Sequence, residues 1–156
     1  LSAWSPRNYT EAPVTDQQID MIVQCGIKAP SSRNSQPWHF TVLKNETIMK
    51  EIIPNITPGN VIIIISGKVS QSGTTPDFDC GLATQNMFVA ATSMDLGARI
   101  YGGPIAAARE RQEALGIPEG YTPVMMLRVG NIEKSTDAVS GASPRKSKEE
   151  LVNYVR

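Results

Sequence analysis

The chain has 156 residues, and its fifteen basic and fifteen acidic side chains cancel to a formal net charge of zero. That length suits a single domain over residues 1–156, and the missing net charge disfavours nucleic acid and anionic membrane as partners, which leaves a small molecule or a second copy of the chain. The longest apolar run, 61–65, is too short to span a bilayer and the N-terminus lacks a signal-peptide pattern, so a cytoplasmic location is expected by default.

The first predicted element is a helix from Asp16 to about Lys28. Thr15 and Gln18 have capping-box spacing, in which each side chain bonds the backbone of the other residue. Pro30 prevents the helix from continuing. Apolar residues recur every three or four positions and predict one buried stripe, made of Ile19, Ile22, Val23 and Ile27.

Strands and a short helix follow a polar loop. Aromatic and branched residues predict a strand over 38–43, and Asn45 can cap a short helix that Pro54 closes. Residues 61–65 are apolar without alternation, as in a central strand that is covered on both faces.

The stretch 78–96 is predicted to be a helix that is apolar on nearly every side and that ends at Gly97. Such a helix must be covered on nearly every side, by its own sheet and, on any side that the sheet leaves open, by a candidate second subunit. A short strand over 98–101, a helix over 104–115 ended by Gly116, and a strand over 124–129 come next. Ser147 and Glu150 cap a last helix, whose predicted apolar face is Leu151, Val152 and Val155.

The interspersed helices and strands favour one sheet layered with helices.

The sequence lacks the residues that metal-dependent and hydrolytic active sites need. His39 is the only histidine, and Cys25 and Cys80 form no metal-binding pair, so neither a metal centre nor a Ser-His-Asp device is expected; the cysteines are interpreted as small buried hydrophobes. The glycine-rich phosphate-binding motifs of nucleotide-binding folds are also absent from the sequence.

The remaining candidate is the loop 30–38, which carries hydroxyl, amide and guanidinium side chains between Pro30 and Pro37. Neutral donors and acceptors of this kind suit the polar edges of a heteroaromatic ring, and a guanidinium suits a phosphate. The alternative is a polar surface turn whose Asn34 and Ser35 bond the local backbone, and residue types alone favour that alternative.

The segment Ala29-Pro30-Ser31-Ser32-Arg33-Asn34-Ser35-Gln36-Pro37-Trp38-His39-Phe40 resembles the signature of the FMN-dependent nitroreductase family. The resemblance extends over nearly the whole chain, in order. Further matching segments are Arg7-Asn8-Tyr9-Thr10, Asp79-Cys80-Gly81-Leu82-Ala83-Thr84-Gln85-Asn86, Leu96-Gly97-Ala98-Arg99-Ile100-Tyr101-Gly102-Gly103, Gly116-Ile117-Pro118-Glu119-Gly120-Tyr121 and Arg145-Lys146.

The resemblance implies an α+β fold, namely a three-layer α/β/α sandwich with a mostly antiparallel sheet, in an interlocked homodimer with FMN at the subunit interface. It implies that Ser5 and Arg7 bind the FMN phosphate or ribityl chain and that Arg145, with Lys146, completes the phosphate clamp, because an arginine fork grips phosphate in two places. The implied ring and ribityl contacts from the loop are Pro30, Ser31, Ser32, Asn34 and Gln36, with the prolyl and seryl groups reaching across the dimer.

At the end of the predicted strand 98–101, Tyr101 leads into Gly102 and Gly103, whose backbone is implied to face flavin N5. The implied chemistry is a ping-pong hydride transfer in which NADH or NADPH reduces FMN, which then reduces a nitroaromatic, a quinone or a similar small aromatic acceptor. FMN carries this chemistry, so no catalytic side chain and no metal is expected.

Two departures from the family pattern bear on the site. Ala3 and Trp4 stand where many members have a basic pair, so one expected phosphate contact is either missing or supplied by Arg99, Lys146 or an upstream residue. Only six residues separate Pro54 from Val61, where larger members insert helical material. The alternatives are a flavin-binding protein of this fold without turnover, and a superfamily variant that acts in flavin breakdown or dehalogenation.

Overall fold

A computed structural model of the protein describes residues 5–69, 75–133 and 145–155. Its sheet has the strand order β1-β2-β4-β3, and every neighbouring pair is antiparallel. The strands are β1 (Trp38–Leu43), β2 (Val61–Gly67), β3 (Gly97–Tyr101) and β4 (Thr122–Gly130). The expected antiparallel sheet is therefore confirmed. Ala3 and Trp4 lie outside the described residues.

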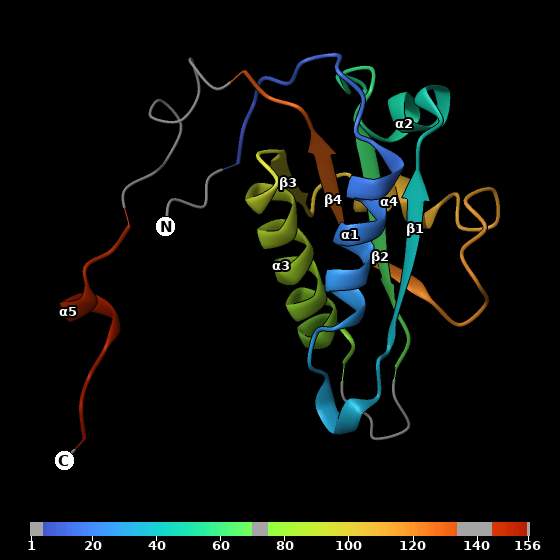
Figure 1. The fold of residues 1–156 in the computed structure, drawn as a ribbon. Coiled ribbons are helices and arrows are strands. Elements are labelled where there is room, and N and C mark those ends of the chain that lie inside the picture. Colours follow the sequence, from blue (N-terminus) through green and yellow to red (C-terminus); the bar gives the residue numbers. More distant parts are fainter. Residues whose placement is uncertain (1–4, 70–74, 134–144, 156) are drawn as a thin grey trace.

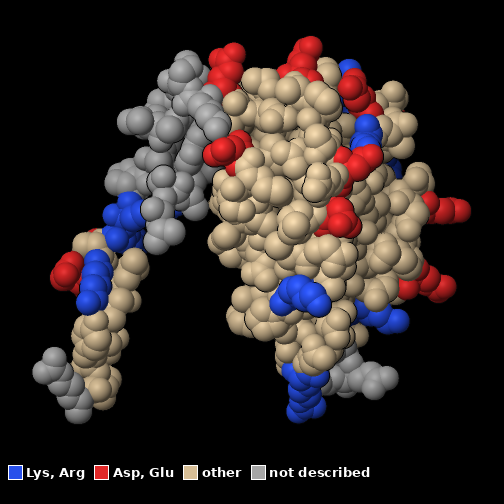
Figure 2. Space-filling view, viewed as in Figure 1, with Lys and Arg blue, Asp and Glu red and all other residues tan. Residues whose placement is uncertain are grey.

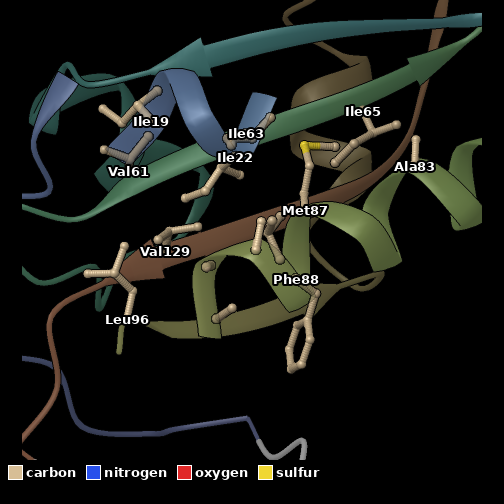
Figure 3. Packing of buried hydrophobic residues seen from close by; sticks show 14 of the residues in the cluster. Ile19, Ile22, Val61, Ile63, Ile65, Ala83, Met87, Phe88, Leu96 and Val129 are labelled. Carbon is tan, nitrogen blue, oxygen red and sulfur yellow. The ribbon is translucent and has the colours of Figure 1, made fainter. Parts of the chain in front are cut away.

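β2 is buried over its whole length because helices cover both faces of the sheet. Val61, Ile63 and Ile65 point toward α1 (Asp16–Ile27) and α3 (Asp77–Ser93), as Figure 3 shows, while Ile62 and Ile64 belong to a second core. That second core contains residues of α2 (Glu46–Ile52) and α4 (Ile105–Arg109). Helices thus lie on both faces (Figure 1), which confirms the three-layer sandwich.

α1 confirms its predicted start and most of its predicted stripe. Thr15 and Gln18 form the capping box, with the Gln18 amide donating to the Thr15 hydroxyl at 3.2 Å. Ile19 and Ile22 are buried against the sheet and α3. Ile27, however, is 40% exposed at the end of the helix, where α3 covers the neighbouring Gly26 through Met87 instead. The prediction that Ile27 belongs to the buried stripe was wrong.

α3 ends earlier than predicted, and Gly97 does not end it. The helix stops at Ser93, where the Thr92 and Ser93 hydroxyls donate to carbonyls of the preceding turn and so compete with helical bonding. Asp95, with φ 61°, takes the left-handed position that we assigned to a glycine, and the Leu96 amide donates to the Ala91 carbonyl at 3.1 Å. Gly97 is instead the first residue of β3.

The helix predicted over 104–115 covers only Ile105–Arg109. From residue 111 the chain turns, with the Arg111 amide donating to the Ala108 carbonyl at 3.2 Å. These turns place Leu115 and Ile117 in the second core, where they are 7% and 8% exposed. Burial of these two apolar side chains outweighs the helical preference of the segment, as tertiary packing commonly does.

The last helix, α5 (Lys148–Leu151), has the predicted capping box at Ser147 and Glu150 but spans only four residues. Val152 is already extended, so the predicted apolar face does not form on a helix. Leu151, Val152 and Val155 are 65%, 46% and 93% exposed. Figure 1 shows that this C-terminal segment lies apart from the rest of the domain.

Among the described residues, no helix is both long enough and apolar enough to cross a membrane.

Candidate functional site

The loop 31–36, between α1 and β1, has a tightly bonded and locally strained backbone. It contains one 3-10 turn, Ser32–Asn34, and the Gln36 amide donates to the Ser31 hydroxyl at 2.9 Å. Arg33, Asn34 and Gln36 have φ angles of 53°, 55° and 46°, a left-handed region that non-glycine residues seldom occupy. Strain of this kind persists only where surrounding bonds hold it, and it is concentrated at functional sites.

One of those bonds comes from the first turn of α3. The Ser32 amide donates to the Asp79 carboxylate at 3.1 Å, and Asp79 is only 3% exposed. A shallow cavity of about 350 Å³ lies beside this bond, lined by Ser32, Thr75, Phe78 and Asp79. Our sequence interpretation assigned no role to Asp79, although a pair of acids, Asp77 and Asp79, at the start of an otherwise uncharged helix was a usable signal.

The loop's polar side chains face outward. Ser32, Asn34 and Gln36 are exposed, Pro30 is exposed and Ser31 is half-buried. The Gln36 side-chain amide donates to the Asn34 carbonyl at 3.3 Å, so the two residues are held together. The loop therefore presents amides and hydroxyls on a fixed backbone, which is what a ring clamp requires.

Ser5 and Arg7 lie at the other end of the sheet. Both side chains are exposed, whereas Pro6 between them is fully buried beside Gly97, the first residue of β3. The Thr10 amide donates to the Asn131 carbonyl just beyond β4 at 2.8 Å, which fixes the segment along the ends of β3 and β4.

Tyr101 closes β3 and leads to Gly102 and Gly103, as predicted. The Arg99 guanidinium lies 5.0 Å from the centre of the Tyr101 ring. A Cβ placed on Gly102 or Gly103 would meet no atom within 4 Å, so space beside this backbone is open to a ligand. From Gly97 to Tyr101 the strand spans roughly 13 Å. The N-terminal segment, Ser5–Tyr9, and the two glycines are thus spaced for an extended ligand that has a phosphate at one end and a ring at the other.

The loop 31–36 and the N-terminal segment cannot reach the same small ligand within one chain. β1 begins at Trp38, which pairs with Gly67, and Gly67 pairs with Thr122. Gly97, in contrast, pairs with Gly130 at the far end of β4. Thr122 and Gly130 are the two ends of the nine-residue strand β4 and lie roughly 26 Å apart along it.

Two of the predicted site residues lie in the C-terminal segment of the chain. Arg145 and Lys146 are exposed and precede α5 in the C-terminal segment that lies apart from the domain (Figure 1). The structure of this single chain does not bring them to the loop. His39 is half-buried with its ring 5.5 Å from that of Tyr121.

The structure gives no sign of a reactive cysteine or a metal centre in its described part. Burial, with smaller contributions from Asp77 and Asp79, raises the pKa of the Cys80 thiol to about 12, so it stays protonated and unreactive at neutral pH. Among the residues described, no group of three or more His, Cys, Asp or Glu side chains could hold a metal ion.

A buried arginine was also missed. Arg128, on β4, is 5% exposed, and its guanidinium lies 3.9 Å from the centre of the Tyr9 ring. Its Nε donates to Asn60 Oδ1 at 2.7 Å and one terminal nitrogen donates to Thr57 Oγ1 at 3.0 Å. A single charged residue within an otherwise uncharged strand was the signal that could have found it.

Comparison with known proteins gives a consistent result. The family model described as "Nitroreductase family" matches residues 2–66 and 55–131. A Methanothermobacter thermautotrophicus protein, provisionally named an NADH dehydrogenase/NAD(P)H nitroreductase, is 30% identical over 139 residues, which are 81% of this chain and 71% of that protein. The NADPH-flavin oxidoreductase of Vibrio harveyi is 24% identical over 88% of this chain and 65% of its own length.

Solved structures agree in fold. A protein of Desulfovibrio desulfuricans, described as a nitroreductase in complex with FMN, is 26% identical with a TM-score of 0.79, covering 99% of this chain and 92% of the other. The Desulfitobacterium hafniense nitroreductase with bound FMN is 23% identical with a TM-score of 0.79, covering 98% and 94%. With the family model matching most of its length, the chain belongs to the nitroreductase family.

Proposed function

We propose that this protein is an FMN-dependent oxidoreductase that uses NADH or NADPH to reduce nitroaromatics, quinones or similar electron-poor acceptors. The observation that carries the proposal is the pair of exposed polar segments, loop 31–36 and Ser5–Arg7 with Gly102 and Gly103, in a chain of the nitroreductase family. FMN-bound relatives of the same fold support the choice of cofactor.

The residues present fit FMN. Asn34 and Gln36 offer neutral amides to the ring, and the open space beside Gly102 and Gly103 admits a flat group close to the backbone. Arg7 supplies a positive charge and a planar fork for the phosphate or the ribityl chain, with Ser5 beside it. Arg145 and Lys146 are further candidates for the phosphate.

FMN, when bound, would supply the hydride-transfer chemistry between a nicotinamide donor and the acceptor. The chain's own residues would bind FMN and orient its ring. The backbone at Gly102 and Gly103 would direct N–H groups toward the ring, and the held geometry of Asn34 and Gln36 would fix its edge. No acid or base side chain is required from this protein.

The site is proposed to form between two copies of the chain. Because the loop 31–36 and the N-terminal segment lie at opposite ends of the sheet, the loop of one subunit would complete the site that Arg7 and Gly102 begin in the other. Exposed apolar side chains support a dimer, since soluble monomers rarely expose them in groups. They include Phe78 and Val89 on α3, and Leu151, Val152, Tyr154 and Val155 in the C-terminal segment.

The test is an anaerobic titration of the purified full-length chain, reconstituted with FMN, with NADH and separately with NADPH. Bleaching of the flavin absorbance by either donor, followed by its return on adding a quinone, is the expected result. If the oxidised spectrum persists with both donors, the protein binds flavin without turnover. If FMN does not bind at all, the proposed flavin function is wrong.

Sedimentation should give a dimer at micromolar concentration, and a monomer that still binds FMN tightly would contradict the shared site.

A further inference from the structure

Gly97 and Gly130 face each other across β3 and β4 and leave a hollow at this end of the sheet. A Cβ on Gly97 would meet Ile132 first and would lie 2.6 Å from Pro6 Cγ, and a Cβ on Gly130 would meet the Asn60 side-chain amide first and would lie 2.7 Å from Tyr9 Cδ1. Real Cβ atoms essentially never come so close, so both positions are glycine because Pro6 and Ile132 at one, and Tyr9 and Asn60 at the other, occupy the space that side chains would take. The N-terminal segment is thus seated in a fitted hollow.

Arg128 closes that hollow from the side. Its guanidinium stacks on the Tyr9 ring at 3.9 Å while it holds Asn60 and Thr57, which lie between α2 and β2. One terminal nitrogen of Arg128 also lies 3.5 Å from the Tyr101 hydroxyl. The N-terminal segment, the end of β3 and the segment before β2 therefore meet at one side chain.

This guanidinium is costly to bury. Arg128 is 5% exposed, its hydrogen-bond partners given above are all neutral, and no ion pair to it is found within the described residues. Without a carboxylate partner, a buried charge is compensated for its lost solvation only by its hydrogen bonds and aromatic contacts. Here its aromatic and hydrogen-bond contacts fix two segments that flank the proposed flavin site.

We propose that Arg128 is a positioning residue, which acts through Tyr9 and Tyr101 to hold the Ser5–Arg7 segment and the Gly102–Gly103 backbone in register for one flavin. The inference rests on the proposed function. Pro6 and Tyr9 face inward on either side of Arg7, so fixing them turns Arg7 outward, toward the phosphate or ribityl chain. Arg128 itself does not touch the cofactor in this assignment.

A double-mutant cycle tests the assignment, with the full-length chain and FMN binding followed by quenching of flavin fluorescence. Arg7→Ala should weaken binding about tenfold or more, as expected for one charge-assisted contact. Arg128→Met should weaken it by a similar factor, and Arg7→Ala should then cost less than about twofold in the Arg128→Met background. The matched control is Arg109→Met, which removes an arginine whose side chain donates to the Pro123 carbonyl and for which no contact with Tyr9 or Tyr101 is found among the described residues.

Two further variants keep the test decisive if Arg128→Met does not fold. Tyr9→Leu removes the ring and should reproduce the loss, whereas Tyr9→Phe keeps the ring and should restore most of the affinity. FMN binding within twofold of wild type for both Arg128→Met and Tyr9→Leu would overturn the assignment. So would losses for Arg7→Ala and Arg128→Met that simply multiply, because Arg128 would then act independently of Arg7.

Hydrogen exchange separates this inference from the proposed function. If the wild-type chain fails to bind FMN, the flavin function falls, but the hollow can still be tested on the apo protein. Arg128→Met should then speed exchange of the Thr10 amide, which donates to Asn131, relative to Arg109→Met. Unchanged exchange there would overturn the positioning role by itself.

Discussion

The loop 31–36 and the N-terminal segment Ser5–Tyr9 are held in opposite ways. The loop has bonds of its own, through Ser31 and Gln36, and one bond from Asp79 on a neighbouring helix. The N-terminal segment depends on distant residues, because Gly97 and Gly130 make room for it and Arg128 packs against it. A polar segment can thus be fixed either by its own backbone or by a surface shaped elsewhere.

Because they are held differently, the loop and the N-terminal segment should respond to substitutions in different parts of the chain. Substitutions near the loop should disturb it only where they remove a named hydrogen bond or change a left-handed residue. Substitutions far along the chain, in strands that contribute nothing to the ligand directly, should disturb the N-terminal segment.

The largest effect is expected at the glycine hollow. Gly130→Val would push atoms against Tyr9 and the Asn60 amide, and such overpacking should lower the free energy of unfolding by about 3 kcal/mol. Chemical denaturation measures the change. The matched control is Gly81→Ala on α3, where a Cβ meets nothing, and it should raise the free energy by about 0.5–1 kcal/mol. Equal effects at the two glycines would remove the basis for a fitted hollow.

The next effect concerns the bond that ties the loop to α3. Asp79→Ala leaves the Ser32 amide without its acceptor and should cost about 2 kcal/mol of unfolding free energy, together with part of the FMN affinity. Asp77→Ala, in the same helical turn but exposed, should cost less than about 1 kcal/mol and leave FMN binding unchanged. An Asp79→Ala protein as stable as Asp77→Ala would show that the bond does not hold the loop.

The thiol beside Asp79 gives a pH-dependent measure of the same end of α3. Because the folded-state pKa of Cys80 is about 12 and its ordinary value is 9.0, the unfolded chain loses this proton first as pH rises. The stability linked to Cys80 is therefore complete below pH 9 and is lost as pH rises toward 12. Between pH 8 and pH 10 the wild-type chain should lose about 1 kcal/mol more than Cys80→Ala in denaturant titrations. Parallel losses in the two proteins would mean that the thiol is not buried in this way.

The smallest effect tests the strain in the loop. Arg33 is exposed with φ 53°, so Arg33→Gly should raise the free energy of unfolding by roughly 0.5 kcal/mol by relieving a left-handed conformation. Ser35→Gly, at φ −70°, is the control and should lower it by a similar amount, since glycine there adds only freedom to the unfolded chain. A loss at both positions would indicate that the Arg33 side chain is needed for the loop.

Local patterns in the sequence predicted much of the fold. The continuous apolar run 61–65 identified the central strand, and capping boxes at Thr15 and Ser147 marked where two helices begin. Ends that depend on tertiary packing were predicted less well. The helix that starts at Ile105 stops early because Leu115 must reach the core, and α3 stops before Gly97 because Asp95 takes the left-handed turn.

The site shows the same division. The loop was predicted because its polar residues are contiguous and its sequence resembles a known family. Asp79 and Arg128 were not predicted, since their roles depend on contacts with residues far away in the sequence. Asp79 lies 47 positions from its partner Ser32, and Arg128 is still farther along the chain from Tyr9. A charge in a buried strand or helix signals such a contact but does not identify its partner.

The placement of the loop 31–36 and of Arg7 at opposite ends of one sheet has a genetic consequence under the proposed dimer. A chain with Arg7→Ala and a chain with Asn34→Ala are each defective in both sites of their own homodimer. When the two assemble together, one site collects both substitutions and the other receives neither. Co-expression of two inactive alleles would then restore up to half of the sites in each mixed dimer, which is intragenic complementation arising from the path of the chain.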